Sequence, residues 1–140
     1  MSDRGHAGVE MALAVGVLLL PVTLVVTGFG PWSERRVTAE AAAAEAARAA
    51  VLELSVEAGE ATMMATLDGQ GIDPGQVRVG WCGSAPATSP AGACPLERGS
   101  VVTATVELWA PLVVTPWGPI GGLWVVGEHS EPIDLYRSLG

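Results

Sequence analysis

The sequence contains no lysine, and its seven basic residues are all arginines. Acidic residues outnumber them, with 15 Asp and Glu and a formal net charge of −8 at pH 7. Proteins that bind nucleic acid neutralise its phosphates with clusters of Lys and Arg. The sequence offers no such basic patch, so nucleic acid is not an expected partner.

Catalytic motifs are missing as well. The chain has two histidines, His6 and His129, and it contains no phosphate-binding glycine loop, Cys-x-x-Cys motif or Gly-x-Ser-x-Gly elbow. A metal site around His129 would combine one histidine with loop carboxylates, and a solvated strand end is the favoured interpretation. We therefore expect no catalytic residue, no metal and no cofactor, and we do not expect an enzyme.

Cysteine is scarce, with Cys82 and Cys94 alone. Their spacing does not match a zinc site, and no second pair is present. Two interpretations are open: a disulfide in an exported domain, or two free thiols in a cytosolic domain. We favour the disulfide, which would contribute about 3 kcal/mol in the chain-entropy treatment of a loop of this size.

A long apolar run is the feature that the chain does have, because residues 11–33 carry no charge. About 20 helical residues span a hydrocarbon core of roughly 30 Å. The run lacks the polar face that a helix on a soluble domain needs. It predicts a helix that lies in lipid or in an equally apolar bundle. Glu10 stands directly before the run, where a carboxylate is costly in a membrane.

The spacing of Gly5 and Glu10 resembles the class III leader of type IV pilins and pseudopilins, in which a prepilin peptidase cuts after a glycine and a glutamate is the fifth mature residue. Residues 4–13, Arg-Gly-His-Ala-Gly-Val-Glu-Met-Ala-Leu, are similar to those of the TadE-like minor pseudopilins of the tight-adherence (Flp) pilus. The resemblance implies cleavage between Gly5 and His6, and it implies that Glu10 neutralises the new amine of a neighbouring subunit. The alternative is a plain membrane anchor with an interfacial glutamate.

This resemblance implies a structural protein, a minor pseudopilin that assembles into a tight-adherence pilus through its hydrophobic N-terminal helix. The implied partners are the prepilin peptidase, the membrane, other pilins and the pilus assembly platform. The chain would cross the cell membrane once with its C-terminal domain extracytoplasmic, or become part of an extracellular pilus. The positive-inside rule taken alone favours the opposite orientation, because Arg35 and Arg36 follow the apolar run and Arg4 precedes it.

The pattern along the chain predicts an α+β fold, pilin-like in layout, with a long kinked N-terminal helix and a small antiparallel β-sheet. Pro21 and Pro31 are expected to kink the helix. A seven-residue repeat of small apolar residues from Val37 to Ala65 predicts a stripe that packs either within the same chain, against its own sheet, or against adjacent subunits. The expected segments are a leader at 1–5, a transmembrane and assembly helix at 6–30, an amphipathic helix continuing outward at 31–70, and a sheet domain at 71–140.

Three strands are expected in the sheet domain, because the hydrophobic period there is two. They cover residues 76–81, 100–112 and 123–129. The proline- and glycine-rich stretch from Pro111 to Gly122 predicts an irregular connection. Within it, Trp117 is the tryptophan expected to be exposed and available for contact. The polar end, residues 130–140, is expected to be loosely held or to add a short edge.

Two other functions are open. A pseudopilin of another pilus or secretion machine would carry the same leader and helix. A bitopic, membrane-anchored extracytoplasmic binding module would instead recognise a ligand through a tryptophan-bearing sheet and would not assemble into a pilus. Exposed tryptophans that share one sheet face would favour the binding module.

Overall fold

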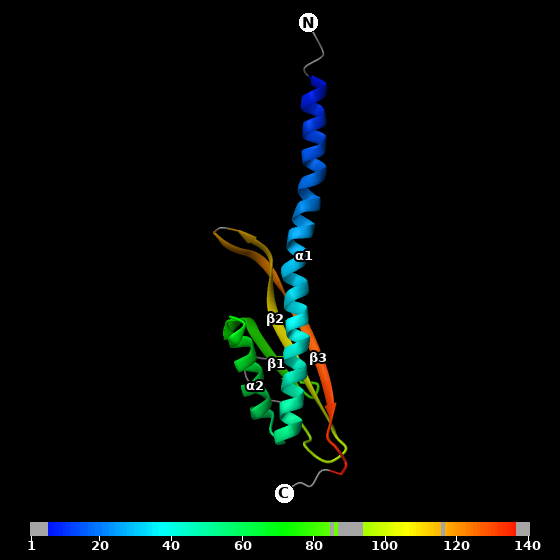
Figure 1. Cartoon of the computed structure of the whole chain (residues 1–140), viewed down its shortest axis with the longest axis vertical. Coiled ribbons are helices and arrows are strands. Elements are labelled where there is room, and N and C mark those ends of the chain that lie inside the picture. The colour runs from blue at the N-terminus through cyan, green and yellow to red at the C-terminus, as the bar shows by residue number, and fades with distance from the viewer. Residues whose placement is uncertain (1–5, 85, 87–93, 116, 137–140) are drawn as a thin grey trace.

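The computed structural model describes residues 6–84, 86, 94–115 and 117–136, and within these the side chains at positions 6, 7, 24, 27, 28 and 115 are not described. It shows an α+β fold in which helices pack on a three-stranded antiparallel sheet (Figure 1). The helical elements are α1 (His6–Glu53), α2 (Val56–Gly69) and the single 3-10 turn η2 (Pro74–Gln76). The strands are β1 (Val77–Trp81), β2 (Val101–Thr115) and β3 (Gly118–Pro132), in the order β1-β2-β3. The predicted α+β class is confirmed at this level.

The helix α1 is continuous over 48 residues, a length of about 72 Å. It passes through Pro21 and Pro31. Each proline removes one backbone hydrogen bond, yet neither ends the helix, and the kinks expected at them stay a prediction. The C-terminal half of α1 covers the sheet, while the N-terminal half projects beyond it (Figure 1). Across the described residues, no helix is both long and apolar enough to cross a membrane.

The single amphipathic helix predicted over residues 31–70 is wrong in one respect, because it divides in two. α1 ends at Glu53, and Leu54 adopts a left-handed conformation with a φ of 51°. The Ser55 N–H donates to the Ala50 carbonyl at 3.1 Å, which closes the helix with a bond of the Schellman type. Ser55 then caps α2, since its hydroxyl accepts a hydrogen bond from the Ala58 N–H at 3.2 Å. α2 therefore folds back beside α1 (Figure 1).

Replacing Ser55 by alanine is expected to destabilise the protein by about 1 kcal/mol, the usual cost of removing an N-cap side chain. Part of this loss should depend on pH. The backbone N–H of Glu57 and the Ser55 hydroxyl, which donates to the carboxylate at 2.9 Å, lower the pKa of Glu57. A lowered carboxyl pKa contributes stability above the usual carboxyl pKa, and that contribution is lost as pH falls through the lowered value.

Urea unfolding at neutral and at acidic pH measures both effects of this cap. Ser55→Thr is the matched control, because it keeps a hydroxyl at the N-cap. The difference between Ser55→Ala and the wild type should shrink as Glu57 is protonated. Identical unfolding midpoints for Ser55→Ala and the wild type at neutral pH would show that the cap contributes nothing.

Small residues build the contact between α1 and the sheet. Six alanines on one face of α1 are buried, at positions 39, 42, 43, 46, 47 and 50. Glycines face them: a Cβ on Gly127 of β3 would lie 2.5 Å from the Ala39 carbonyl oxygen. On α2, a Cβ on Gly59 would lie 2.7 Å from the Ala46 carbonyl oxygen. Of the stripe predicted from Val37 to Ala65, Ala47 and Val51 are buried, whereas Val37 is exposed, because the buried face of α1 is centred on the alanines.

The strand predicted at 76–81 is confirmed as β1, whereas the other two strands are longer than predicted. β2 and β3 pair from Val101–Pro132 at one end to Thr115–Gly118 at the other. The irregular connection expected from Pro111 to Gly122 is wrong, because these residues are themselves cross-strand partners. β1 pairs only with residues 104–108 of β2. Pro111 therefore lies where β2 has become a strand edge, and an edge tolerates a missing N–H.

The end of the described chain is held more firmly than predicted. β3 continues to Pro132, and Ile133 is 2% exposed. The Ile133 N–H donates to the Ser100 carbonyl at 2.9 Å, and the Gly99 N–H donates to the Ile133 carbonyl at 3.1 Å. Of the two expectations for residues 130–140, the loosely held end is wrong as far as Ile133, because this apolar side chain joins the core. The added edge is confirmed for residues 130–132, which extend the edge strand β3. Residues 137–140 lie outside the described part.

Candidate functional site

A long apolar surface covers the N-terminal half of α1. Every described residue from position 8 to position 30 is exposed. Apolar surface of this extent is uncommon on a monomer in water and marks a site for an apolar partner. The large apolar side chains that are exposed here are Val9, Met11, Leu13, Val15, Val17, Leu18, Leu19, Leu20, Val22, Val25, Val26 and Phe29.

Glu10 is the single Asp, Glu, Lys or Arg between Gly5 and Ser33 in the sequence. It is exposed on α1, one helical turn after His6, and no other described side chain pairs with it. His6 is the first residue of α1, while Gly5 and the rest of the predicted leader lie outside the described residues. A lone carboxylate on an apolar surface is suited to pair with a positive charge on a partner.

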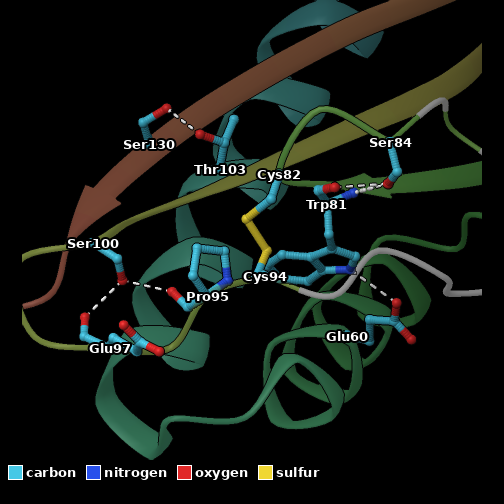
Figure 2. Close-up of a disulfide and its surroundings, with 10 residues drawn as sticks. All are labelled: Glu60, Trp81, Cys82, Ser84, Cys94, Pro95, Glu97, Ser100, Thr103 and Ser130. Atoms are coloured by element: carbon cyan, nitrogen blue, oxygen red, sulfur yellow. Dashed lines mark hydrogen bonds between the residues drawn. A yellow bond between two sulfur atoms is a disulfide. The ribbon is translucent and has the colours of Figure 1, made fainter.

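Cys82 and Cys94 form the predicted disulfide, with their Cα atoms 5.4 Å apart (Figure 2). The bridge follows directly after β1, beside the buried ring of Trp81. The Trp81 Nε1–H donates to the Glu60 carboxylate at 2.9 Å and so ties β1 to α2 (Figure 2). The backbone N–H of Trp81 donates to the Ser84 hydroxyl at 2.9 Å. Of the residues that the disulfide encloses, 85 and 87–93 lie outside the described part.

His129 lies on β3, and its ring contacts the Glu131 carboxylate at 3.3 Å. This pair is half-buried near the end of the strand. Among the residues that the structure describes, no group of three His, Cys, Asp or Glu side chains could hold a metal ion.

A two-stranded hairpin extends beyond β1, and we call it the arm. It comprises residues 111–115 of β2 and 118–122 of β3, joined at a tip that includes Trp117. Trp117 is 93% exposed, which agrees with the exposure predicted for it, while a contact made by its ring stays a prediction. The sequence has no Asp, Glu, Lys or Arg from 108 to 127. The exposed large apolar side chains of the arm are Leu112, Val113, Val114 and Ile120.

A groove of about 340 Å³ separates the base of the arm from the middle of α1. The side chains along it are apolar. From α1 come Val25, Phe29 and Trp32, and from the sheet come Ala110, Pro111, Leu112 and Leu123. The apolar surface of α1 is therefore continuous with the apolar surface of the arm.

The sheet face turned away from α1, the outer face, carries two half-buried tryptophans. Trp109 and Trp124 are direct cross-strand partners, with ring centroids 5.4 Å apart and planes inclined at 65°. The Arg78 guanidinium lies 3.9 Å from the Trp124 ring centroid, and it approaches the Glu107 carboxylate at 3.7 Å. A Cβ on Gly122 would lie 2.8 Å from the Trp109 Nε1, so this indole lies across the glycine. Two indoles in edge-to-face contact beside a charged pair can bind a planar or cationic ligand.

The chain matches no protein-family model, no curated protein and no solved structure. Its function therefore has to follow from its own surfaces. These are the apolar half of α1 with Glu10, the arm with Trp117, and the outer face with Trp109 and Trp124.

Proposed function

We propose that this chain is a minor pseudopilin of the tight-adherence type, a structural subunit that assembles through the N-terminal half of α1. One observation carries the proposal: an exposed apolar half-helix bears Glu10 as its single formal charge, five residues after Gly5. The interpretation of the fold as pilin-like rests on this same half-helix. The other half of the same helix is packed on a small sheet, which would face outward from the filament.

The exposed half of α1 requires an apolar surrounding. Burying one large aliphatic side chain contributes about 1.5–3 kcal/mol relative to leaving it in water. Among the described side chains from Val9 to Phe29, twelve large apolar ones are exposed, so burying part of them exceeds an association cost of about 4–15 kcal/mol. That surrounding is lipid before assembly and neighbouring helices afterwards. The membrane step rests on the sequence of residues 11–33, which carries no charge, because none of the helices, taken over the described residues, is both long and apolar enough to cross a membrane.

Glu10 provides the electrostatic part of assembly. Cleavage between Gly5 and His6 by a prepilin peptidase creates a positively charged amine at the start of α1. A lone charge is costly in an apolar surrounding, whereas two opposite charges that pair are tolerated. In the proposed filament, Glu10 of one copy pairs with the amine of the next copy.

The disulfide supports an extracytoplasmic location for the sheet domain. Disulfides persist in oxidising compartments and are rare in the cytosol, and Cys82 and Cys94 are bonded. With the sheet domain outside the cytoplasm, the N-terminal end of α1 would lie on the cytoplasmic side of the membrane. The peptidase and the assembly platform act on that side. Other pilins would then contact the chain along α1.

Replacing Glu10 by alanine in the native host tests the proposal. A broken charge pair in an apolar interface costs roughly 3–5 kcal/mol, so the amount of this chain in sheared surface filaments should fall by at least about tenfold. The level in the membrane should not change. Glu34→Ala is the matched control, because Glu34 is also an exposed glutamate on α1. Normal filament levels for the Glu10 variant would contradict the proposal.

A second function is favoured by the shared face of Trp109 and Trp124. As a membrane-anchored binding module, the chain would use this outer face for a ligand, with Arg78 and Glu107 at its edge. This function requires that Glu10→Ala leaves the protein fully active. It also requires that Trp109→Ala abolishes ligand binding while the protein stays folded. A screen of soluble oligosaccharides and aromatic cations by calorimetry supplies the readout.

A further inference from the structure

We propose that the arm is a second membrane contact, which lies in the lipid headgroup region beside α1. The inference rests on the proposed function, because it needs the N-terminal half of α1 in a bilayer. It goes further, because it assigns a lipid-binding role to a part of the sheet domain. Trp117 at the tip is its central residue.

The arm is apolar on both of its faces. Alternate residues of a strand point to opposite faces of a sheet. Val113 and Ile120 are cross-strand partners on one face, and Val114 and Pro119 are partners on the other. A hairpin that docks on one folded partner needs a single apolar face, with polar residues toward water on the other. Lipid matches the two apolar faces of the arm. Glu34 and Arg35, which line a pocket together with Pro111 and Val114, place the arm at the headgroup boundary and not in the hydrocarbon core, where charged groups are costly.

Trp117 has the chemistry and the exposure of an interfacial anchor. Tryptophan gathers at membrane–water interfaces, since its ring is apolar and its N–H needs a polar partner. The Trp117 side chain is 93% exposed at the tip. The sequence from 108 to 127 has no charge that would oppose contact with lipid.

The arm lies at the level where the apolar run of α1 ends. The groove at its base brings Leu112 and Leu123 opposite Val25, Phe29 and Trp32. Glu34 and Arg35 are the first charged residues after the apolar run, so Phe29 and Trp32 lie near the end of that run. Figure 1 shows the arm at the end of the sheet nearest the free half of α1. A bilayer that surrounds this half of α1 would therefore also meet the arm.

The backbone of the arm limits how deep it can enter. Beyond β1 the arm has two strands only, so each strand has one edge without a described partner strand. Unpaired N–H and C=O groups are costly in the hydrocarbon core, where water is absent. The arm should therefore stay at the boundary of headgroups and acyl chains, roughly 5–10 Å below the surface.

Site-specific fluorescence on the full chain tests the inference. The described part of the chain has no free cysteine, so a single added cysteine can carry an environment-sensitive dye. The protein is reconstituted into vesicles of phosphatidylcholine and phosphatidylglycerol that contain nitroxide lipids with the label near the headgroup or deep in the chain. Probes are placed at Val114→Cys in the arm, Leu18→Cys in α1 and Glu97→Cys before β2.

The expected result has three parts. The Val114 probe shifts to shorter wavelengths and is quenched more by the shallow nitroxide than by the deep one. The Leu18 probe is quenched by the deep nitroxide. The Glu97 probe, at the opposite end of β2, keeps the emission of a dye in water. Adding Trp117→Ser to the Val114 variant should remove its shift, and circular dichroism checks that this exposed substitution leaves the fold intact.

Each failure has a distinct meaning. Quenching at Leu18 without quenching at Val114 would overturn the arm contact and leave the proposed function standing. Absence of quenching at both positions would overturn the membrane step of the proposed function as well. A shift at Val114 that needs a high ratio of protein to lipid, without quenching by nitroxide lipids, would assign the arm to a second copy of the chain and overturn the lipid contact.

Discussion

Replacing Gly127 by alanine is expected to destabilise the fold by roughly 3 kcal/mol, which is in the upper part of the range for overpacked cores. Gly127 lies in β3 opposite Val106 and against α1. A Cβ there would collide with the backbone of Ala39 and Glu40. Backbone atoms inside a helix cannot rotate away as a side chain can. Relief therefore requires α1 to move off the sheet, which opens the contact made by the buried alanines.

Urea unfolding of the purified chain in detergent, followed by circular dichroism, measures this loss. Gly69→Ala is the matched control, because Gly69 lies at the end of α2 with nothing within 4 Å of a built Cβ. Alanine is favoured over glycine in a helix by about 0.5–1 kcal/mol, so the control should be neutral or slightly stabilised. A Gly127→Ala protein as stable as the control would show that α1 and β3 do not pack this closely.

Removing the disulfide has an expected effect of similar size. Cys82 and Cys94 are 12 residues apart, and closing a loop of about this length contributes roughly 3 kcal/mol in the chain-entropy treatment. The effect should be strongest around β1, because the bridge lies next to Trp81 and its hydrogen bond to Glu60. The double substitution Cys82→Ser with Cys94→Ser leaves no thiol to react.

The double serine variant and the wild type are compared by urea unfolding and by hydrogen exchange of β1. Wild type treated with a reductant is the matched control, since it loses the bond and keeps both sulfur atoms. Both proteins should lose stability by the same amount, with faster exchange at Val79 and Trp81. Unchanged stability in both would show that the closed loop does not constrain the unfolded chain.

Local patterns in the sequence were sufficient for several parts of the fold. The alternation around Val77 and Val79 needs only a period of two, and it predicted β1 correctly. Two cysteines without metal spacing predicted the disulfide. The absence of charge over residues 11–33 predicted a helix with an apolar surface, and that half of α1 is exposed. Each of these features depends on neighbouring residues or on a single pair.

The turn between α1 and α2 was missed, because the usual signal is absent. Helices that close in this way normally place glycine in the left-handed position, whereas this chain has Leu54 there. The available signal was Ser55 with Glu57 in the first turn of α2, since serine is a favoured N-cap. The alanine-rich sequence on both sides obscured it, because alanine favours helix throughout.

The arm and the outer face were missed for a different reason. Proline and glycine at 111–122 normally indicate an irregular loop, whereas here the residues before and after the tip pair with one another as a hairpin. A signal was present in the approximate symmetry around Trp117, because Leu108–Trp109 is paired with Trp124–Val125 and Val113 with Ile120. The contact between Trp109 and Trp124 depends on this register, which the sequence pattern alone does not set.

The mass of the intact chain, expressed with and without an active prepilin peptidase, is the most direct test of the assignment to pseudopilins. Residues 1–5 are expected to be lost only when the active peptidase is present, so that His6 becomes the first residue. A Glu57→Ala chain, altered far from Gly5, serves as the control and should be cut equally. A chain that keeps residues 1–5 in the presence of the peptidase would contradict the account and favour an anchored protein that binds its ligand through Trp109 and Trp124.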